Sequence, residues 1–268
     1  MERELEITRK IAREAGRILM EIYSGDHSVE WKGHDDPVTA ADHAANKFIV
    51  AELRRHFPDD GILSEEATDD PVRLNKARVW LVDPMDGTKQ FIERIGEFAV
   101  MIGLAINGKP VLGVVYNPAT NKMYYAATGS NAYLEESLTT KRLHVAATTD
   151  PAQMAAAMSR SHNSPKVDLI TERLGIARQV QSGSVGLKVG LLAEGRAHLY
   201  LHLGDKTNQW DTCAPQAIIE AAGGIMTDRD GQPLQYNIAE IRNLNGVVAS
   251  SGVMHERVIE EIQKVLVG

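Results

Sequence analysis

The sequence predicts a protein of mixed α and β structure whose two halves differ in character. In residues 1–147, β-rich runs follow one another across short turns, which is typical of an antiparallel sheet in an α+β arrangement. In residues 148–268, short strands alternate with helical segments, as they do in α/β proteins. No linker, repeat or low-complexity tract separates the halves, so we expect them to be fused around one active-site cleft.

Composition narrows the class of protein. A chain of 268 residues with 43% hydrophobic residues can bury substantial cores. Its net charge of −7 argues against a nucleic-acid polymer as partner, because binding to a phosphate backbone requires a basic surface. The single cysteine, Cys213, excludes an intramolecular disulfide and fits a reducing compartment. The first residues are charged and no apolar run could span a bilayer, so we expect a cytoplasmic protein without a membrane partner.

Two helices and one strand are predicted before the central part of the chain. Residues 5–23 carry apolar side chains at helical spacing. A second helix begins within residues 38–42 and ends before Pro58. Residues 61–66 read as a brief strand that ends in two acids, and the polar segment 69–78 is expected to be a loop or a short helix.

The central stretch, residues 79–98, begins with a short buried strand that ends abruptly in the motif DPMDGT. Pro84 should place Asp83 and Asp86 on either side of a sharp bend, so that both carboxylates converge on one point. Gly87 permits a close backbone approach, and Thr88 can open a helical turn whose N–H groups point to the same place. Carboxylates and a phosphate repel each other unless a cation lies between them. The pattern therefore predicts Mg²⁺ bridging protein and phosphate.

Two alternatives apply to this motif. A strand followed by an ordinary Asp/Gly turn explains the proline and the glycine, but not two acids flanking a proline after a buried strand. Aspartyl-phosphate phosphatases carry their acids as Asp-x-Asp, whereas the spacing here is Asp-x-x-Asp. A covalent aspartyl mechanism is therefore disfavoured.

Three further acids lie at the ends of predicted elements. Asp42 lies in the first turns of the second helix, where the helix dipole alone would explain it. Glu65 follows a buried run, as Asp83 does, although a Glu pair before a polar loop is usually only a solvated charge pair. Asp211 lies near the start of a helix, where a capping Asp is the ordinary explanation. Cys213 is expected to be a packing residue, because no His lies nearby in sequence.

The remaining elements follow from pattern alone. We expect the antiparallel sheet to contain residues 98–106, 111–116, 122–127, 132–134 and 142–145. Helices are expected over residues 166–174, 187–193, 210–222 and 254–266. The strands that alternate with them are expected over residues 178–181, 197–201, 225–227 and 247–250.

Four motifs together resemble the signature set of the inositol monophosphatase superfamily, the lithium-sensitive, magnesium-dependent phosphatases. They are DPVTAAD at 36–42, SEE at 64–66, DPMDGT at 83–88 and WDTCAP at 210–215. The stretches at 86–100 and 182–200 are most similar to the 3′(2′),5′-bisphosphate nucleotidase branch. The resemblance implies a layered α-β-α-β-α sandwich, as in fructose-1,6-bisphosphatase, and often a homodimer.

The resemblance also implies a role for each matched residue. The metal ligands, most of them in the first half, would be Glu65, Asp83, the main-chain carbonyl of Met85, Asp86 and Asp211, around two or three Mg²⁺ ions. The catalytic residues would be Thr88, polarised by Glu65 to activate the attacking water, and Asp42, a further acid near that water or an additional metal. The substrate-binding set would be Glu65, Asp86, Gly87, Thr88, Ser184, Lys188 and Asp211.

Some positions depart from the family pattern. Ser64 replaces a Gly that often precedes the Glu pair, a choice also found in the nucleotidase branch. His202 lies where that branch often has an Arg, and Gly186 lengthens the segment before Lys188. Lys188 is our candidate cation for a second substrate phosphate, against the alternative of a solvent-facing lysine on an amphipathic helix. These positions concern the substrate and not the type of reaction.

The expected reaction is direct in-line attack of a metal-activated water on a small phosphomonoester, most of all adenosine 3′,5′-bisphosphate. Inositol monophosphatase activity is the nearest alternative and fructose-1,6-bisphosphatase activity a lesser one. A non-catalytic, metal-dependent binding protein on the same fold is a further alternative, because a fold alone does not prove activity. Such a protein would have no need for the water-activating pair of Glu65 and Thr88.

Overall fold

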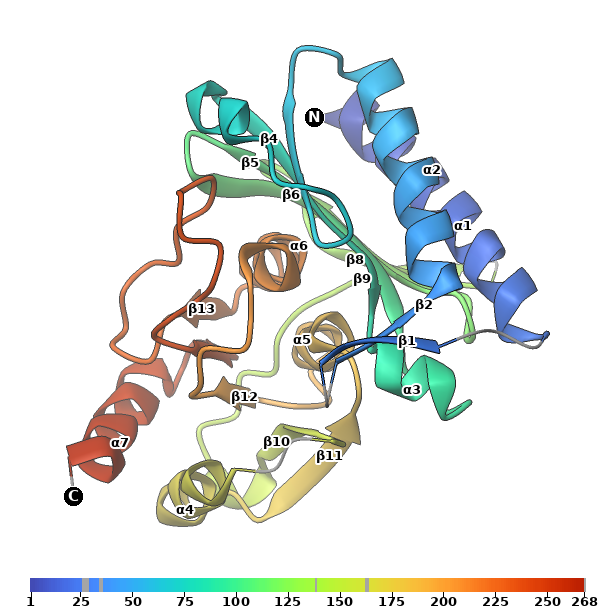
Figure 1. The fold of residues 1–268 in the computed structure, drawn as a ribbon. Coiled ribbons are helices and arrows are strands. Elements are labelled where there is room, and N and C mark those ends of the chain that lie inside the picture. The colour runs from blue at the N-terminus through green and yellow to red at the C-terminus, as the bar shows by residue number, and fades with distance from the viewer. Residues whose placement is uncertain (26–28, 34–35, 138, 162–163, 268) are drawn as a thin grey trace.

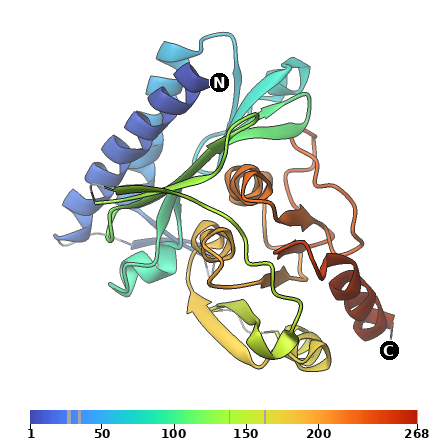
Figure 2. The same ribbon diagram turned by 180° about the vertical axis from the view of Figure 1, so that it is seen from behind.

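The structure is a computed structural model that describes residues 1–25, 29–33, 36–137, 139–161 and 164–267, with only the backbone for 29–33 and 36–39. The two larger of the three sheets in the described residues alternate with three layers of helices, and Figures 1 and 2 show these layers from opposite sides. The helices in layer order are α1 (Glu2–Tyr23) and α2 (Ala40–His56), then α5 (Val185–Ala193) and α6 (Gln209–Ala221), then α4 (Pro165–Leu174) and α7 (His255–Val267). The predicted α-β-α-β-α sandwich is confirmed.

The larger sheet has seven strands in the order β3-β4-β5-β6-β7-β8-β9. Their bounds are β3 (Gly61–Ser64), β4 (Arg78–Asp86), β5 (Ala99–Ile106), β6 (Lys109–Asn117), β7 (Lys122–Ala127), β8 (Tyr133–Glu136) and β9 (Thr139–Arg142). Every neighbouring pair is antiparallel except β3 and β4, which are parallel. The predicted antiparallel sheet is therefore confirmed, and its last two strands lie a few residues away from the predicted ranges.

Strand β4 corrects one expectation. We expected the strand to end at Asp83, but it continues to Asp86. Its pairing with β5 shifts register, since Asp83 lies opposite Met101 and Asp86 lies opposite Ala99. This is a bulge, which changes the direction of side chains without ending the strand. Pro84 fits a bulge because its missing N–H breaks no regular ladder bond there.

The smaller sheet has five strands in the order β11-β10-β12-β14-β13. Their bounds are β10 (Ala155–Ser159), β11 (Arg178–Ser182), β12 (Leu199–His202), β13 (Ile225–Thr227) and β14 (Val247–Ser250). Strand β10 is parallel to β11 and β12, whereas β14 is antiparallel to β12 and β13. Pattern analysis missed β10, because its sequence AAAMS is rich in alanine, which is depleted in strands.

Hydrophobic clusters hold the layers together. Leu19 and Ile49 pack α1 and α2 on one face of the larger sheet. Ile218 of α6 belongs to the cluster between the two sheets. Ile170 and Ile262 pack α4 and α7 on the outer face of the smaller sheet. Each helix therefore buries an apolar face, which is the main source of its stability in the fold.

Helix α6 lies directly against the larger sheet. A Cβ atom at Gly113 would lie 2.2 Å from the carbonyl oxygen of Ala214, and one at Gly103 would lie 2.7 Å from Sγ of Cys213. Glycine at these two positions lets the helix approach this closely. Cys213 is fully buried in this contact, as a packing residue would be. The contact fixes the helix relative to β5 and β6.

The remaining elements are short. They are β1 (Val29–Gly33), β2 (Asp36–Thr39), the 3-10 turns η1 (Pro71–Asn75) and η2 (Pro151–Gln153), and α3 (Thr88–Ile92). The segment 69–78 thus contains a short helical turn, one of the two forms expected. None of the described helices combines the length and apolar composition needed to cross a membrane. The division into halves at residues 147 and 148 stays a prediction, and α5 and α6 of the second half pack between the sheets.

Candidate metal and substrate site

Four of the predicted acids meet at one cleft of about 860 Å³. Because β3 and β4 are parallel, the chain brings Glu65, directly after β3, beside Asp83 of β4. The Glu65 N–H donates to the carbonyl of Val82 at 3.1 Å. Asp86 follows at the end of the bulge, and Asp211 lies in the first turn of α6. Glu65, Asp83, Asp86 and Asp211 all line the cleft.

The motif at 83–88 is fixed by its own hydrogen bonds. The Met85 N–H donates to Oδ1 of Asp83 at 2.9 Å, and the Thr88 hydroxyl donates to the carbonyl of Met85 at 3.1 Å. Gly87 has φ +98°, and a Cβ there would lie 2.7 Å from the carbonyl oxygen of Glu97. Only glycine fits this left-handed, crowded position. Helix α3 begins directly afterwards, at Thr88, as the sequence predicts.

Asp86 is held by the start of α5. Oδ2 of Asp86 accepts hydrogen bonds from the Ser184 hydroxyl and, at 3.0 Å, from the Gly186 N–H. The Ser184 oxygen also accepts the Leu187 N–H at 3.1 Å, which caps the helix. Ser184 is fully buried, and its hydroxyl positions Asp86. A substrate contact by Ser184 stays a prediction.

Lys188 of α5 lines the same cleft as the acids. Its residue is only 2% exposed, because α5 is buried between the two sheets. The Nζ atom donates to the carbonyl of Gly183 at 3.1 Å and lies 5.2 Å from the centre of the Tyr200 ring. Burial lowers the pKa of Lys188 to about 8, while Asp86, among other acids, acts in the opposite direction. The alternative of a solvent-facing lysine is wrong.

Burial and mutual repulsion shape the acid cluster. Burial raises the pKa of Asp83 well above its usual value, and the charges of Glu65, Asp86, Asp211 and Asp42 raise it further. The pKa of Asp211 is raised for the same reasons, by burial first and then by Glu65 and Asp86. Such a cluster holds its full negative charge only with cations among its oxygens.

The donor set fits Mg²⁺. All predicted ligands offer oxygen atoms, which hard divalent cations prefer over the nitrogen and sulfur ligands of zinc sites. Across the described residues, no three His, Cys, Asp or Glu side chains stand in a preset coordination geometry. The Asn208 N–H donates to Oδ2 of Asp211 at 2.7 Å, which orients that carboxylate at the start of α6.

Asp42 is buried as well. It is 3% exposed in the first turn of α2, and its charge is one of those that act on Asp83. The side chains of residues 36–39, the first part of the motif at 36–42, lie outside the described residues. The role of Asp42 near water or a further metal stays a prediction.

Sequence reasoning missed several polar residues of the cleft. They come from α3, from β10 and the segment after it, from β12, from the loop before α6 and from the connection between β13 and β14: Lys89, Gln90, Ser159, Ser161, Tyr200, Lys206 and Arg242. No spacing rule marks them, because they come together only through the tertiary fold. His202, whose role the sequence leaves open, also lines the cleft.

Two contacts join α3 and the segment after it to the segment at the end of β10. The Gln90 amide donates to the Ser161 hydroxyl at 2.7 Å. The Arg160 guanidinium donates to both oxygens of Glu97, at 2.8 and 2.6 Å. These bonds tie the segment after β10, in the second half, to the segment after the metal motif.

Nearly the whole chain is similar to known proteins. Residues 1–266 match the family model described as the inositol monophosphatase family. The chain belongs to this family. As an inositol monophosphatase family member, it is 44% identical over 241 residues to the 3′(2′),5′-bisphosphate nucleotidase CysQ of Salmonella typhimurium, which covers 88% of this chain and 95% of the relative. The CysQ of Escherichia coli strain K12 is also 44% identical, over 236 residues that cover 86% and 93% of the two chains.

Solved structures agree with this membership. An IMPase of Thermotoga maritima superposes on this family member with a TM-score of 0.84 at 28% identity, covering 99% of this chain and 98% of the other. The CysQ of Bacteroides thetaiotaomicron superposes with a TM-score of 0.79 at 32% identity, covering 92% and 97%. The layered fold is thus shared over nearly the whole length of both proteins.

Proposed function

We propose that this protein is a magnesium-dependent phosphomonoesterase that releases phosphate from adenosine 3′,5′-bisphosphate. The observation that carries the proposal is the convergence of Glu65, Asp83, Asp86 and Asp211, with Thr88 among them, on one buried cleft. The two CysQ relatives at 44% identity support the nucleotidase branch over the inositol phosphatases.

The chain supplies ligands, a water-positioning group and phosphate contacts. Glu65, Asp83, the Met85 carbonyl, Asp86 and Asp211 would hold two or three Mg²⁺ ions. The bound ions would supply Lewis acidity and a water of lowered pKa. The Thr88 hydroxyl, held at the Met85 carbonyl, and Glu65 would orient this water for in-line attack. Backbone N–H groups of Gly87 and Thr88 would hold the transferred phosphate.

The phosphate that is not cleaved needs a fixed cation. A net charge of −7 offers no general attraction for a bisphosphate, so local cations must provide it. Lys188 is our candidate, because it is the cation that the fold buries directly beside the acid cluster. The exposed Lys89, Lys206 and Arg242 on the same cleft could complement it for the more solvated parts of a nucleotide.

The decisive experiment is a panel of phosphomonoesters assayed with Mg²⁺ for released phosphate. Adenosine 3′,5′-bisphosphate should give a higher kcat/KM than inositol 1-phosphate and fructose 1,6-bisphosphate. A preference for inositol 1-phosphate would instead assign inositol monophosphatase activity. Release from none of them, with Mg²⁺-dependent binding by calorimetry, would identify a binding protein.

Two expectations about the cellular setting also stay proposals. We propose a cytoplasmic location, from the single cysteine, and a homodimer, from the family resemblance. Sedimentation of the purified protein tests the homodimer, and fractionation of cells tests the location.

A further inference from the structure

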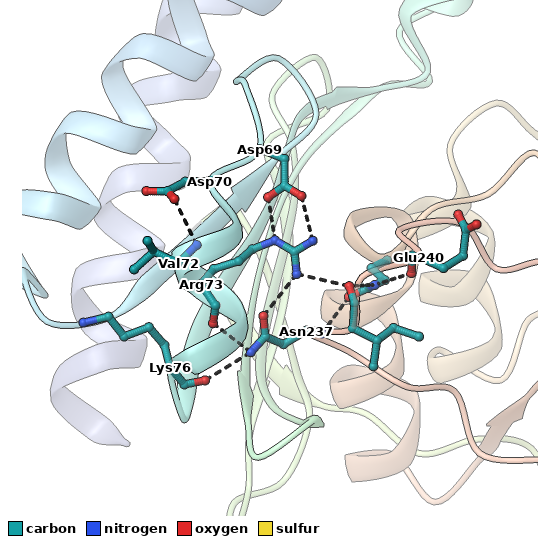
Figure 3. Close-up of polar contacts among 9 residues, drawn as sticks. Asp69, Asp70, Val72, Arg73, Lys76, Asn237 and Glu240 are labelled. Atoms are coloured by element: carbon teal, nitrogen blue, oxygen red, sulfur yellow. Dashed lines mark hydrogen bonds and ion pairs between the residues drawn. The ribbon is translucent and has the colours of Figure 1, made fainter.

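Arg73 is a buried arginine in the connection between β3 and β4, the two strands that carry Glu65 and Asp83. Its side chain is 1% exposed. Figure 3 shows its guanidinium paired with Asp69, where Nε and Nη2 donate to the two carboxylate oxygens at 2.6 and 2.8 Å. Burying a guanidinium is unfavourable unless its other donors are also satisfied.

The third nitrogen of the guanidinium, Nη1, donates to residues in the second half of the protein. Nη1 of Arg73 donates to Oδ1 of Asn237 at 3.1 Å and to the carbonyl of Ile238 at 3.2 Å. The Asn237 amide in turn donates to the carbonyls of Arg73 and Lys76, at 3.0 and 3.1 Å. Figure 3 shows Asn237 inserted into the turn that Arg73 forms. Segments 164 residues apart are therefore joined in both directions.

The Asn237 segment also holds the start of α6. The Asn237 N–H donates to Oε1 of Gln209 at 2.7 Å, and the Gln209 amide donates to the carbonyls of Ile238 and Glu240, at 3.3 and 2.8 Å. Gln209 is 1% exposed and is the first residue of α6. Asp211 follows two residues later in the same helical turn.

We infer that Arg73, Asn237 and Gln209, which we call the Arg73 brace, position Asp211 against the acids of the larger sheet for metal binding. This inference rests on the proposed function. The like charges of Asp83 and Asp211 repel each other, so their approach needs an anchor outside the acid cluster. The brace provides one, because it joins the connection that follows Glu65 to the turn that carries Asp211. Its members are positioning residues and touch neither substrate nor metal.

The sharpest test is Asn237→Gly. Asn237 has φ +56°, a left-handed conformation that glycine adopts without strain, so the substitution removes mainly the side-chain amide. Mn²⁺ serves as the probe because it accepts the same oxygen ligands as Mg²⁺. We expect calorimetry to show Mn²⁺ binding weakened by about tenfold or more, the usual range for loss of an outer-shell partner. The Mg²⁺ concentration for half-maximal activity should rise by a similar factor.

Arg73→Lys is the second variant, and Arg78→Lys is its matched control. Lysine keeps the charge that pairs with Asp69 but lacks the planar fork that reaches Asn237 and Ile238 at the same time. Arg78 begins β4, at the end of the same connection, yet it donates to Asp60 at 2.9 Å and to Glu4 at 3.3 Å, both in the first half. Arg73→Lys should weaken Mn²⁺ binding as Asn237→Gly does, and Arg78→Lys should leave the Mn²⁺ affinity at the wild-type value.

Thermal unfolding of each variant separates positioning from stability. Weaker Mn²⁺ binding by both brace variants, with Arg78→Lys losing as much thermal stability but no affinity, supports the inference. Wild-type Mn²⁺ affinity in Asn237→Gly and Arg73→Lys, or an equal loss in Arg78→Lys, overturns it and leaves the proposed function standing. A wild-type protein that neither binds Mn²⁺ nor releases phosphate overturns the proposed function and the inference with it.

Discussion

Asp86 links the two halves of the chain through hydrogen bonds. It lies at the end of β4, yet its carboxylate accepts hydrogen bonds from Ser184 and Gly186 at the start of α5. Burial raises the pKa of Asp86, while Lys188 and these hydrogen bonds lower it. The pKa of Asp86 is raised overall, so Lys188 and these hydrogen bonds offset only part of the effect of burial on the anion that a metal ligand requires.

We expect Asp86→Asn to abolish turnover and to leave the fold intact. Asparagine keeps the size of the side chain but removes the charge that attracts a cation. Because a bound metal lowers the pKa of its water by many units, the loss should reduce kcat by several orders of magnitude. Phosphate release at saturating Mg²⁺ measures the effect, and circular dichroism checks the fold. Near-normal activity of the variant would contradict the assignment.

The role of Lys188 can be separated from general damage by comparing two substrates. Lys188→Met replaces a buried side chain with a neutral one of similar volume and should leave no cavity. Loss of a hydrogen bond to a charged group is worth about 1.5–3 kcal/mol, so kcat/KM for adenosine 3′,5′-bisphosphate should fall roughly ten- to a hundredfold. A much smaller loss is expected for inositol 1-phosphate, which has no second phosphate. Equal losses on both substrates would show that Lys188 serves the acid cluster alone.

At the scale of elements, His255 connects α7 to the smaller sheet. It is buried at the first residue of α7, with Nδ1 2.9 Å from the Ser250 hydroxyl and Nε2 2.9 Å from the Thr227 hydroxyl. Burial lowers the pKa of His255, although Glu256 acts in the opposite direction. The folded state therefore prefers the neutral ring, which can bond to both hydroxyls.

The contribution of His255 to stability should accordingly fall in mild acid, although the raised pKa of Asp83 and of Asp211 works in the opposite direction for the whole protein. Since the folded-state pKa of His255 lies below the unfolded value, its contribution is complete above about pH 6.5 and is lost as the pH falls through the folded pKa. Urea unfolding at about pH 7.5 and about pH 5.5 measures the change. Relative to the wild type, His255→Asn should lose less stability, or gain more, on going from about pH 7.5 to about pH 5.5. The exposed His144 offers a control, and His144→Asn should leave the difference unchanged.

Sequence pattern predicted elements well wherever burial repeats with a fixed period. Helices α1 and α7 each bury one face, and their predicted ranges match the structure within a few residues. Strand β10 was not predicted because alanine has a low strand propensity. Its alanines are buried by neighbouring layers on both sides of the sheet, which the sequence alone does not reveal. The bulge of β4 was not predicted, because a proline after a strand is also consistent with a turn.

The candidate site also contains residues that the sequence predicts and residues that it does not. Local motifs predicted the positions of Asp83, Asp86 and Thr88, because the chemistry lies within six consecutive residues. The Arg73 brace could not be predicted, since Arg73 and Asn237 are 164 residues apart and neither belongs to a motif. The burial of Lys188 also depends on the second sheet covering α5, which the helix sequence alone does not reveal.

For the whole molecule, the acid cluster joins parts from both halves of the chain. Glu65, Asp83 and Asp86 come from the larger sheet, and Asp211 comes from the first turn of α6. Without cations, the repulsion among these acids works against the packing of α6 on the sheet. With cations bound, the same acids should stabilise that packing, since a ligand that binds only the folded state adds its binding free energy to stability.

Mg²⁺ should therefore raise the melting temperature and be required for activity. At about a hundredfold excess over its Kd, binding adds about 2.7 kcal/mol, which corresponds to roughly 5–10 °C for a chain of this size. The rise should be smaller at about pH 5.5 than at about pH 7.5, because burial and neighbouring charge raise the pKa of Asp83 and Asp211, so protons compete with the metal. Excess Ca²⁺ should also stabilise the fold but inhibit turnover, since its looser coordination misaligns the attack, and the family resemblance adds inhibition by Li⁺. Differential scanning calorimetry and phosphate release, each with and without a chelator, measure both effects. Full activity in the chelator would refute the metal assignment, because the roles proposed for Glu65, Asp83, Asp86 and Asp211 depend on a cation among these acids.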